Sequence, residues 1–164
     1  MTQQFDSKDL RRVMSQFATG ITVVTTLDRS GVPAGMTANS FASVSLDPPL
    51  ILLCVDQHIE FFRVITEADH FCVNFLTAAQ ESLSRQFATR GIDKFAGVEY
   101  EAGKTGVPVL RGTLGHVECS RYELLPGGDH IIVLGKVEFL NCAGGEPLMY
   151  FGSRYRLLQP GEPI

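Results

Sequence analysis

The sequence of 164 residues lacks the patterns that mark several common classes of protein. Its four cysteines, Cys54, Cys72, Cys119 and Cys142, lie far apart and form no CxxC pair. This spacing argues against a disulfide framework, and against a zinc site even more strongly. Three of the four sit in apolar runs, where a buried and unreactive thiol is expected. His70 and Cys72 alone show ligand spacing, and two residues do not make a metal site.

Long apolar runs and a surplus of basic charge are missing as well. No apolar stretch approaches the roughly 20 residues that cross a bilayer, and the polar segment 1–12 has no signal-peptide core. The net charge of −4 does not favour a nucleic-acid partner, although a few local cations could still bind a phosphate group. We therefore expect a cytoplasmic protein with no membrane or nucleic-acid partner.

What the sequence does contain is a series of short β-branched segments separated by turn residues. Apolar spacing predicts helices, and alternating or continuous apolar runs predict strands. The predicted helices are 6–17, 59–66 and 79–87, and the predicted strands are 21–27, 33–37, 50–55, 71–76, 112–125, 131–140 and 148–151. The run 50–55 is continuous enough to suggest a central strand.

The middle of the chain alternates strands and helices, which could indicate a parallel βαβ fold. Two observations argue against it. No GxGxxG turn follows a strand, and the two longest strands are joined by the strong hairpin signal of residues 126–129. A mainly β, antiparallel barrel with a few short covering helices fits better. Because there is no repeat or linker, we predict one domain over residues 1–164, with a core at about 10–155.

The segment 35–45 is rich in small and hydroxyl-bearing side chains. Such a stretch suits the polar edge of a planar heteroaromatic ring, where uncharged donors and acceptors are matched one by one. It is also typical of a strand and loop whose hydroxyl groups bond their own backbone. On composition alone the second interpretation is favoured.

Seven motifs in order resemble the flavin reductase-like family, which has an FMN-binding split barrel. They are FATGITVVTT (17–26), GMTANSFASVSLDPP (35–49), FCVNFL (71–76), SRQFA (84–88), DKF (93–95), GDH (128–130) and SRY (153–155). The resemblance covers about residues 10–155. It implies an antiparallel split β-barrel and a homodimer that reduces FMN or FAD with NADH or NADPH. It also implies that the reduced flavin passes to a separate monooxygenase.

The same resemblance implies a set of flavin-binding residues. Along the isoalloxazine ring it places Thr37, Ala38, Asn39 and Ser40. Near the ribityl chain and phosphate it places Ser43 and Ser45, with Asn74, Leu76, Ser84 and Arg85 helping to hold that end. Cys54 and Asp56 would lie beneath the flavin, and Asp56 would bond a ribityl hydroxyl. Lys94 and Phe95 would contact the phosphate or, for FAD, the adenosine end.

The nicotinamide side of the site is assigned in the same way. A histidine at a hairpin tip is more often incidental than functional, but the resemblance places His130 beside the nicotinamide, where it would position C4 over flavin N5. Arg154 would pair with a phosphate, and Tyr155 would stack near the nicotinamide. No residue is assigned as an acid or base, because hydride transfer needs neither. His58, His70 and His116 have no motif support and are interpreted as structural or surface residues.

The leading functional hypothesis is therefore an NAD(P)H:flavin oxidoreductase, the reductase component of a two-component monooxygenase. One alternative is a reductase of another acceptor, such as a corrinoid, with tightly bound FMN. Another is a flavin-binding module without turnover. The sequence leaves open the choice between FMN and FAD, and that between NADH and NADPH.

Overall fold

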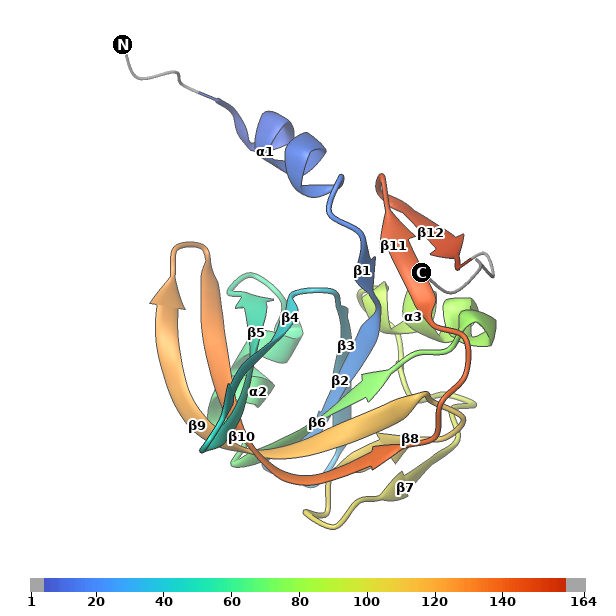
Figure 1. Cartoon of the computed structure of the whole chain (residues 1–164). Helices are drawn as coiled ribbons and strands as arrows, with labels where there is room; N and C mark the ends of the chain where they lie inside the picture. The colour runs from blue at the N-terminus through green and yellow to red at the C-terminus, as the bar shows by residue number, and fades with distance from the viewer. Residues whose placement is uncertain (1–4, 159–164) are drawn as a thin grey trace.

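The protein is described by a computed structural model of residues 5–158, which consists mainly of antiparallel strands (Figure 1). Seven strands form one sheet in the order β3-β2-β6-β9-β10-β5-β4, and every pair in it is antiparallel. They are β2 (Thr22–Leu27), β3 (Pro33–Ala38), β4 (Phe41–Leu46), β5 (Pro49–Asp56), β6 (His70–Phe75), β9 (Gly115–Gly127) and β10 (His130–Cys142). The predicted mainly β, antiparallel fold is confirmed.

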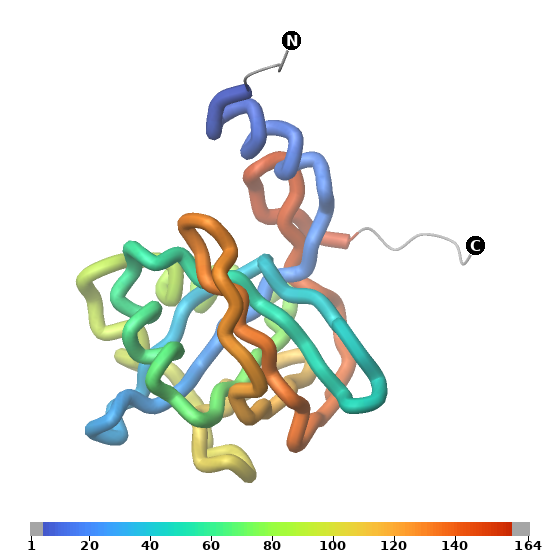
Figure 2. The backbone as a smooth tube through the Cα atoms, turned by 90° about the vertical axis from the view of Figure 1, so that its left-hand side faces the viewer, coloured from blue at the N-terminus to red at the C-terminus, as the bar shows by residue number. Residues whose placement is uncertain are grey.

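Short helices and two small sheets complete the fold. The helices are α1 (Ser7–Met14), α2 (Glu60–Glu67), the 3-10 turn η1 (Ala78–Gln80) and α3 (Glu81–Ala88). The small sheets combine β1 (Thr19–Gly20) with β11 (Leu148–Phe151) and β12 (Arg154–Leu157), and β7 (Tyr100–Ala102) with β8 (Pro108–Leu110). Both overall views show α1 projecting beyond the curled sheet, next to the β11–β12 hairpin (Figures 1 and 2). None of the helices between residues 5 and 158 is long and apolar enough to cross a membrane.

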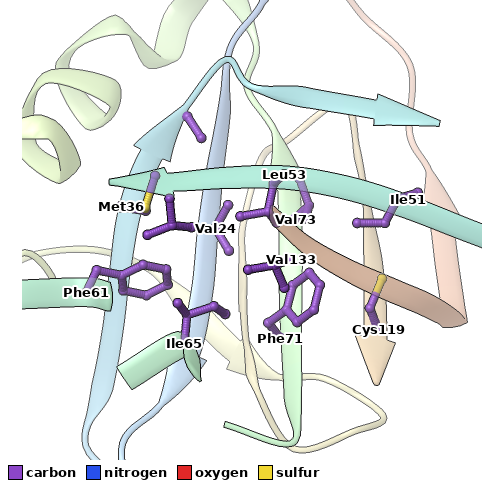
Figure 3. Close-up of a cluster of buried hydrophobic side chains, with 12 residues drawn as sticks. Val24, Met36, Ile51, Leu53, Phe61, Ile65, Phe71, Val73, Cys119 and Val133 are labelled. Atoms are coloured by element: carbon purple, nitrogen blue, oxygen red, sulfur yellow. The ribbon is translucent and has the colours of Figure 1, made fainter. Parts of the chain in front are cut away.

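The large sheet curls around a core to which six of its strands and α2 contribute (Figure 3). Helix α2 buries Phe61 and Ile65, which lie four residues apart on one face. Gly135 allows the curl, because a Cβ at this position would lie 2.5 Å from Cζ of Phe71 and 2.9 Å from Cβ of Cys119. The ladder between β9 and β10 shifts register next to this glycine, as expected where a bulge increases the local twist.

A second apolar cluster joins β2 and Leu76, which directly follows β6, to α3, β8 and β11. Asn74 lies beside it with no exposed surface. Its amide nitrogen donates to the carbonyl of Val23 and to Oγ1 of Thr25, both at 3.0 Å, and its oxygen accepts from the backbone N–H of Leu110 at 2.9 Å. One side chain therefore links β6 to β2 and β8.

Several elements differ from the sequence-based predictions, and the short strands β1, β7, β8 and β12 were not predicted. Helix α1 ends at Met14 instead of Phe17, and Phe17 is largely exposed. Residues 41–46, for which no strand was predicted, form β4 because they pair along β5. Strand β5 is second from the edge of the sheet and not at its centre, and its side chains alternate between buried and half-buried.

Candidate functional site

An open groove lies between β3, the start of α2 and the segment that follows α3. It consists of two adjoining cavities of about 320 and 250 Å³ that share Glu60, Phe61 and Lys94 in their walls. Thr37 and Arg90 line the larger cavity, whereas residues 33–35 and 92–95 line the smaller one. The groove is thus formed where the edge strand β3 meets chain that is distant in sequence.

Close packing of α3 on β3 forms one wall of the groove. A Cβ at Gly35 would lie 2.6 Å from the ring of Phe87, so only glycine permits this approach. Thr37 adds a hydrogen bond from Oγ1 to the carbonyl of Ser84, at 2.6 Å. The side-chain amide of Gln86 donates to the carbonyls of Lys94 and Ala96. These two hydrogen bonds hold the loop that follows α3 against the helix.

Lys94 brings a half-buried positive charge into the wall between the two cavities. Its ammonium group donates to the carbonyl of Gly35 at 3.2 Å, and no carboxylate within residues 5–158 lies within 4 Å of it. Burial lowers the pKa of Lys94, the carboxylate of Glu60 acts in the opposite direction, and Arg90 lowers the pKa further. A half-buried cation beside an open groove fits an anionic ligand such as a nucleotide phosphate.

Two histidine–aspartate pairs lie at the nearby end of β5. Asp56, the last residue of β5, is the register partner of His130 on β10. Nδ1 of His130 lies 2.8 Å from Oδ1 of Asp129, and Nδ1 of His58 lies 2.9 Å from Oδ1 of Asp56. The hydrogen bonds from the backbone and the ring of His58 lower the pKa of Asp56. The β9–β10 tip is therefore brought beside the groove, where His58 forms part of the wall.

The hydroxyl-rich segment divides into two environments. Asn39 is exposed, with a long 3.4 Å contact from its amide to Thr19, and Ala38 is buried. The hydroxyl of Ser40 donates to the carbonyl of Cys54 and accepts from its N–H, as expected for hydroxyl groups that bond backbone. Burial raises the pKa of the half-buried Cys54 thiol, which favours an unreactive thiol.

Ser43 and Ser45 lie away from the groove. They sit on β4 and pair with Ile51 and Leu50, three and four residues along β5 from Cys54. At about 3.3 Å per residue, these pairing positions on β5 lie roughly 10 Å or more from Cys54. Neither side chain lines either cavity of the groove.

Three of the predicted site residues have almost no open surface. Asn74 and Ser84 are fully buried and Leu76 is 1% exposed. The hydroxyl of Ser84 lies 2.9 Å from the hydroxyl of Tyr155, and the carboxamide of Asn74 is occupied in the core. All three side chains thus pack in the scaffold behind the groove, and the ligand contacts that the resemblance implies for them stay a prediction.

The C-terminal hairpin packs on α3 instead of over the groove. The guanidinium of Arg85 lies 4.6 Å above the ring of Tyr155 and 2.7 Å from a carboxylate oxygen of Glu81. Arg154 is exposed. Arg85 and Tyr155 therefore contact each other where the hairpin meets α3, whereas Thr37, Lys94 and Phe95 line the groove.

Sequence reasoning overlooked three residues of the groove. His58 was interpreted as structural or surface, and Glu60 and Arg90 were not singled out. Only Arg90 carried a usable signal, because it follows the SRQFA motif by two residues and precedes the DKF motif. His58 and Glu60 reach the groove through the position of α2, which no local pattern encodes.

Comparison with known proteins identifies the family of the chain. The sequence model described as "Flavin reductase like domain" matches residues 14–159. The chain is 37% identical over 163 residues to the flavin-dependent monooxygenase reductase subunit HsaB of Rhodococcus jostii, covering 99% of this chain and 83% of that protein. It is 40% identical over 161 residues to an NADH-dependent FAD reductase of Streptomyces globisporus, covering 94% of this chain and 87% of that one.

Solved structures give the same relationship. The NADH:FAD oxidoreductase SgcE6 of Streptomyces globisporus, in complex with NAD and FAD fragments, matches with a TM-score of 0.90 and 40% identity. The match covers 99% of this chain and all of that one. Some relatives are longer, since the chain spans about half (49%) of a Rhizobium meliloti protein to which it is 40% identical.

Proposed function

The chain belongs to the flavin reductase like domain family, and on that premise we propose that the groove between β3, α2 and α3 is where it reduces flavin. It is an oxidoreductase that takes a hydride from a reduced nicotinamide nucleotide and delivers it to flavin. As the reductase component of a two-component system, it supplies reduced flavin to a separate monooxygenase. The relatives named for NADH and FAD make these the first pair of reactants to test.

The environment of Lys94 is the main support for locating the flavin site in this groove. Lys94 is a half-buried cation without a carboxylate partner in the part of the chain that the structure describes. It lies in the wall of a groove whose other side is the β3 segment with the family motif. We assign Lys94 to the flavin phosphate and Phe95 to the same end. Asn39 is assigned to the ring edge, because its exposed carboxamide can still donate and accept.

The residues of the chain bind and orient, and none is required to act as a nucleophile. Flavin supplies the hydride acceptor when it is bound. Lys94 provides charge for the phosphate end, while the packing of Gly35 against Phe87 fixes the wall beside it. His130 is assigned to the nicotinamide, and Asp129 orients its ring through Nδ1. Distance and angle between the two reactants are then set by a rigid scaffold.

The test is NADH oxidation by the pure protein with and without added flavin. We expect the rate to rise when FMN or FAD is added, and the flavin to bleach under anaerobic conditions. A protein that retains a yellow flavin which NADH cannot bleach would favour a binding module. Bleaching of a tightly bound FMN without any stimulation by free flavin would favour another final acceptor.

The wider organisation is also proposed. A homodimer is supported by the exposed apolar side chains of α1 and by Leu46, which is 92% exposed on the edge strand β4. A single domain is supported by the continuous seven-stranded sheet and by the family match over 14–159. A cytoplasmic location is supported by the four unpaired cysteines.

A further inference from the structure

The groove has a cationic side of which the family-like motifs assign only Lys94. Arg90 and His58 line the larger cavity together with Lys94. Glu60 is the one carboxylate among the residues that line this cavity. The two cationic side chains, Arg90 and Lys94, therefore outnumber the single carboxylate. An anion that enters the cavity meets donors from two separate segments of chain, the one before α2 and the one after α3.

His58 is held in place before any ligand arrives. Oδ1 of Asp56 accepts from the backbone N–H of His58 at 2.8 Å and contacts its ring Nδ1 at 2.9 Å. A carboxylate at Nδ1 fixes the ring orientation and places the Nδ1 proton toward Asp56. Nε2 is then the nitrogen available to a ligand. Asp56 is therefore a positioning residue for His58, beyond the ribityl contact expected of it.

Resting on the proposed function, we infer that His58 and Arg90 join Lys94 in binding the phosphate group of the flavin nucleotide. The ligand group is a phosphate ester, either the 5′-phosphate of FMN or the diphosphate of FAD. Arg and Lys contribute different recognition, because the guanidinium can make two parallel hydrogen bonds to phosphate oxygens and the ammonium acts as a point charge. The adjoining smaller cavity leaves space beyond Lys94 for the rest of a dinucleotide.

Riboflavin, which lacks the phosphate, provides the decisive comparison. Dissociation constants for riboflavin, FMN and FAD would be measured by flavin fluorescence for the full chain and for the variants Arg90→Ala and His58→Gln. We expect each variant to weaken FMN and FAD binding about fivefold, with riboflavin changed less than about twofold. Arg63→Ala is the matched control, because Arg63 is an exposed arginine that lines a different cavity, and it should change none of the three constants.

The outcomes separate this inference from its premise. Equal losses for riboflavin and FMN, or no loss for either, would overturn the phosphate assignment. A raised KM for NADH with unchanged FMN affinity would also overturn it, by assigning the cations to the nicotinamide diphosphate. Failure of NADH to reduce riboflavin, FMN or FAD would contradict the proposed function instead, while equilibrium binding would still test the phosphate site.

Two more variants test the charge balance and the positioning role. Glu60→Gln removes the carboxylate from the cavity wall and should tighten FMN binding about threefold while riboflavin binding stays the same. Asp56→Asn should weaken FMN binding in the natural background but add little in a His58→Gln background, because the two residues act as one unit. Fully additive losses would show that Asp56 does not act through His58.

Discussion

His130 is placed by its strand and oriented by its neighbour. It begins β10 opposite Asp56, and Oδ1 of Asp129 lies 2.8 Å from its Nδ1. A carboxylate at one ring nitrogen leaves the other for a ligand. His130→Ala should raise the KM for NADH about fivefold, the effect of losing one hydrogen bond of about 1 kcal/mol.

The check is steady-state kinetics with varied NADH beside an equilibrium flavin titration. Flavin affinity should be nearly unchanged in the His130→Ala protein. If the affinity for flavin fell as much as the affinity for NADH, His130 would belong to the flavin half of the site. Its assignment to the nicotinamide would then be incorrect.

Glu118 is a buried carboxylate whose role is structural. Only 1% of its surface is exposed. It accepts hydrogen bonds from the backbone N–H of Lys104 at 3.0 Å, and from the N–H and hydroxyl of Thr105, both at 2.7 Å. Burial alone would raise the pKa of Glu118, but the hydrogen bonds from Thr105 and Lys104 and the charge of His116 outweigh it, so the pKa is lowered.

Because the folded-state pKa is lowered, Glu118 stabilises the protein above the ordinary glutamate pKa of about 4.3, and this contribution is lost as the pH falls through the lower folded value. Glu118→Gln should cost about 2 kcal/mol of unfolding free energy at pH 7. The difference in unfolding free energy between the variant and the parent protein should become smaller at acid pH. Urea unfolding at several pH values measures both, with the exposed Glu123→Gln as control. If this difference in unfolding free energy stayed constant from neutral to acid pH, the ionised form of Glu118 would not be what stabilises the protein.

At the scale of elements, the contact between β3 and α3 determines the shape of the groove. A Cβ at Gly35 would meet the Phe87 ring at 2.6 Å and the carbonyl oxygen of Val24 at 2.9 Å. Gly35→Ala should therefore lower the unfolding free energy by about 1–3 kcal/mol through overpacking, and it should weaken flavin binding by displacing α3.

Gly20→Ala is the matched control for this substitution, because nothing lies within 4 Å of a Cβ built there. Thermal unfolding and a flavin titration would be measured for both variants. Unchanged stability in Gly35→Ala would show that α3 moves away from β3 without cost, so that the groove wall is not rigid.

The strands that could be predicted from sequence are those with a local signal. The long β9–β10 hairpin has turn residues and β-branched runs, and both of its strands are present. Strand β4 has a Ser-rich sequence typical of a loop, and it becomes a strand only because β5 offers a ladder of hydrogen bonds. Lys94 was found through a motif, whereas His58 reaches the groove through the placement of α2, which depends on Phe61 and Ile65 packing into the core.

At the scale of the whole molecule, α1 carries an apolar face that no element within residues 5–158 covers. Leu10, Val13 and Met14 share one side of α1 by their spacing, and Phe17 follows three residues after the helix ends. All four side chains are at least half exposed. Such a face, projecting beyond the curled sheet (Figure 2), fits the surface of a second copy. The strand order of the large sheet and this projection both lie beyond what local sequence patterns predict.

The double variant Val13→Glu, Met14→Glu should therefore shift the protein from dimer to monomer, because it places two charges on the apolar face of α1. Sedimentation velocity measures the mass, and Lys8→Glu, on the opposite side of the helix, should leave the dimer intact. A parent protein that sediments as a monomer would contradict the proposed homodimer, and a dimer that survives the double variant would exclude α1 from its interface.

The seven-stranded sheet does not close, so it has two free margins, β3 and β4. The β3 margin is covered by groups that also build the groove, since Lys94 donates to the Gly35 carbonyl and Thr37 donates to the Ser84 carbonyl. The β4 margin presents Val44 and the almost fully exposed Leu46, which is the kind of edge that recruits further strands. Substitutions that release the loop 92–95 would thus do more than impair catalysis. They would also expose the edge strand β3, which could then pair with strands of other copies. The variant proteins would therefore aggregate during expression in addition to losing ligand binding.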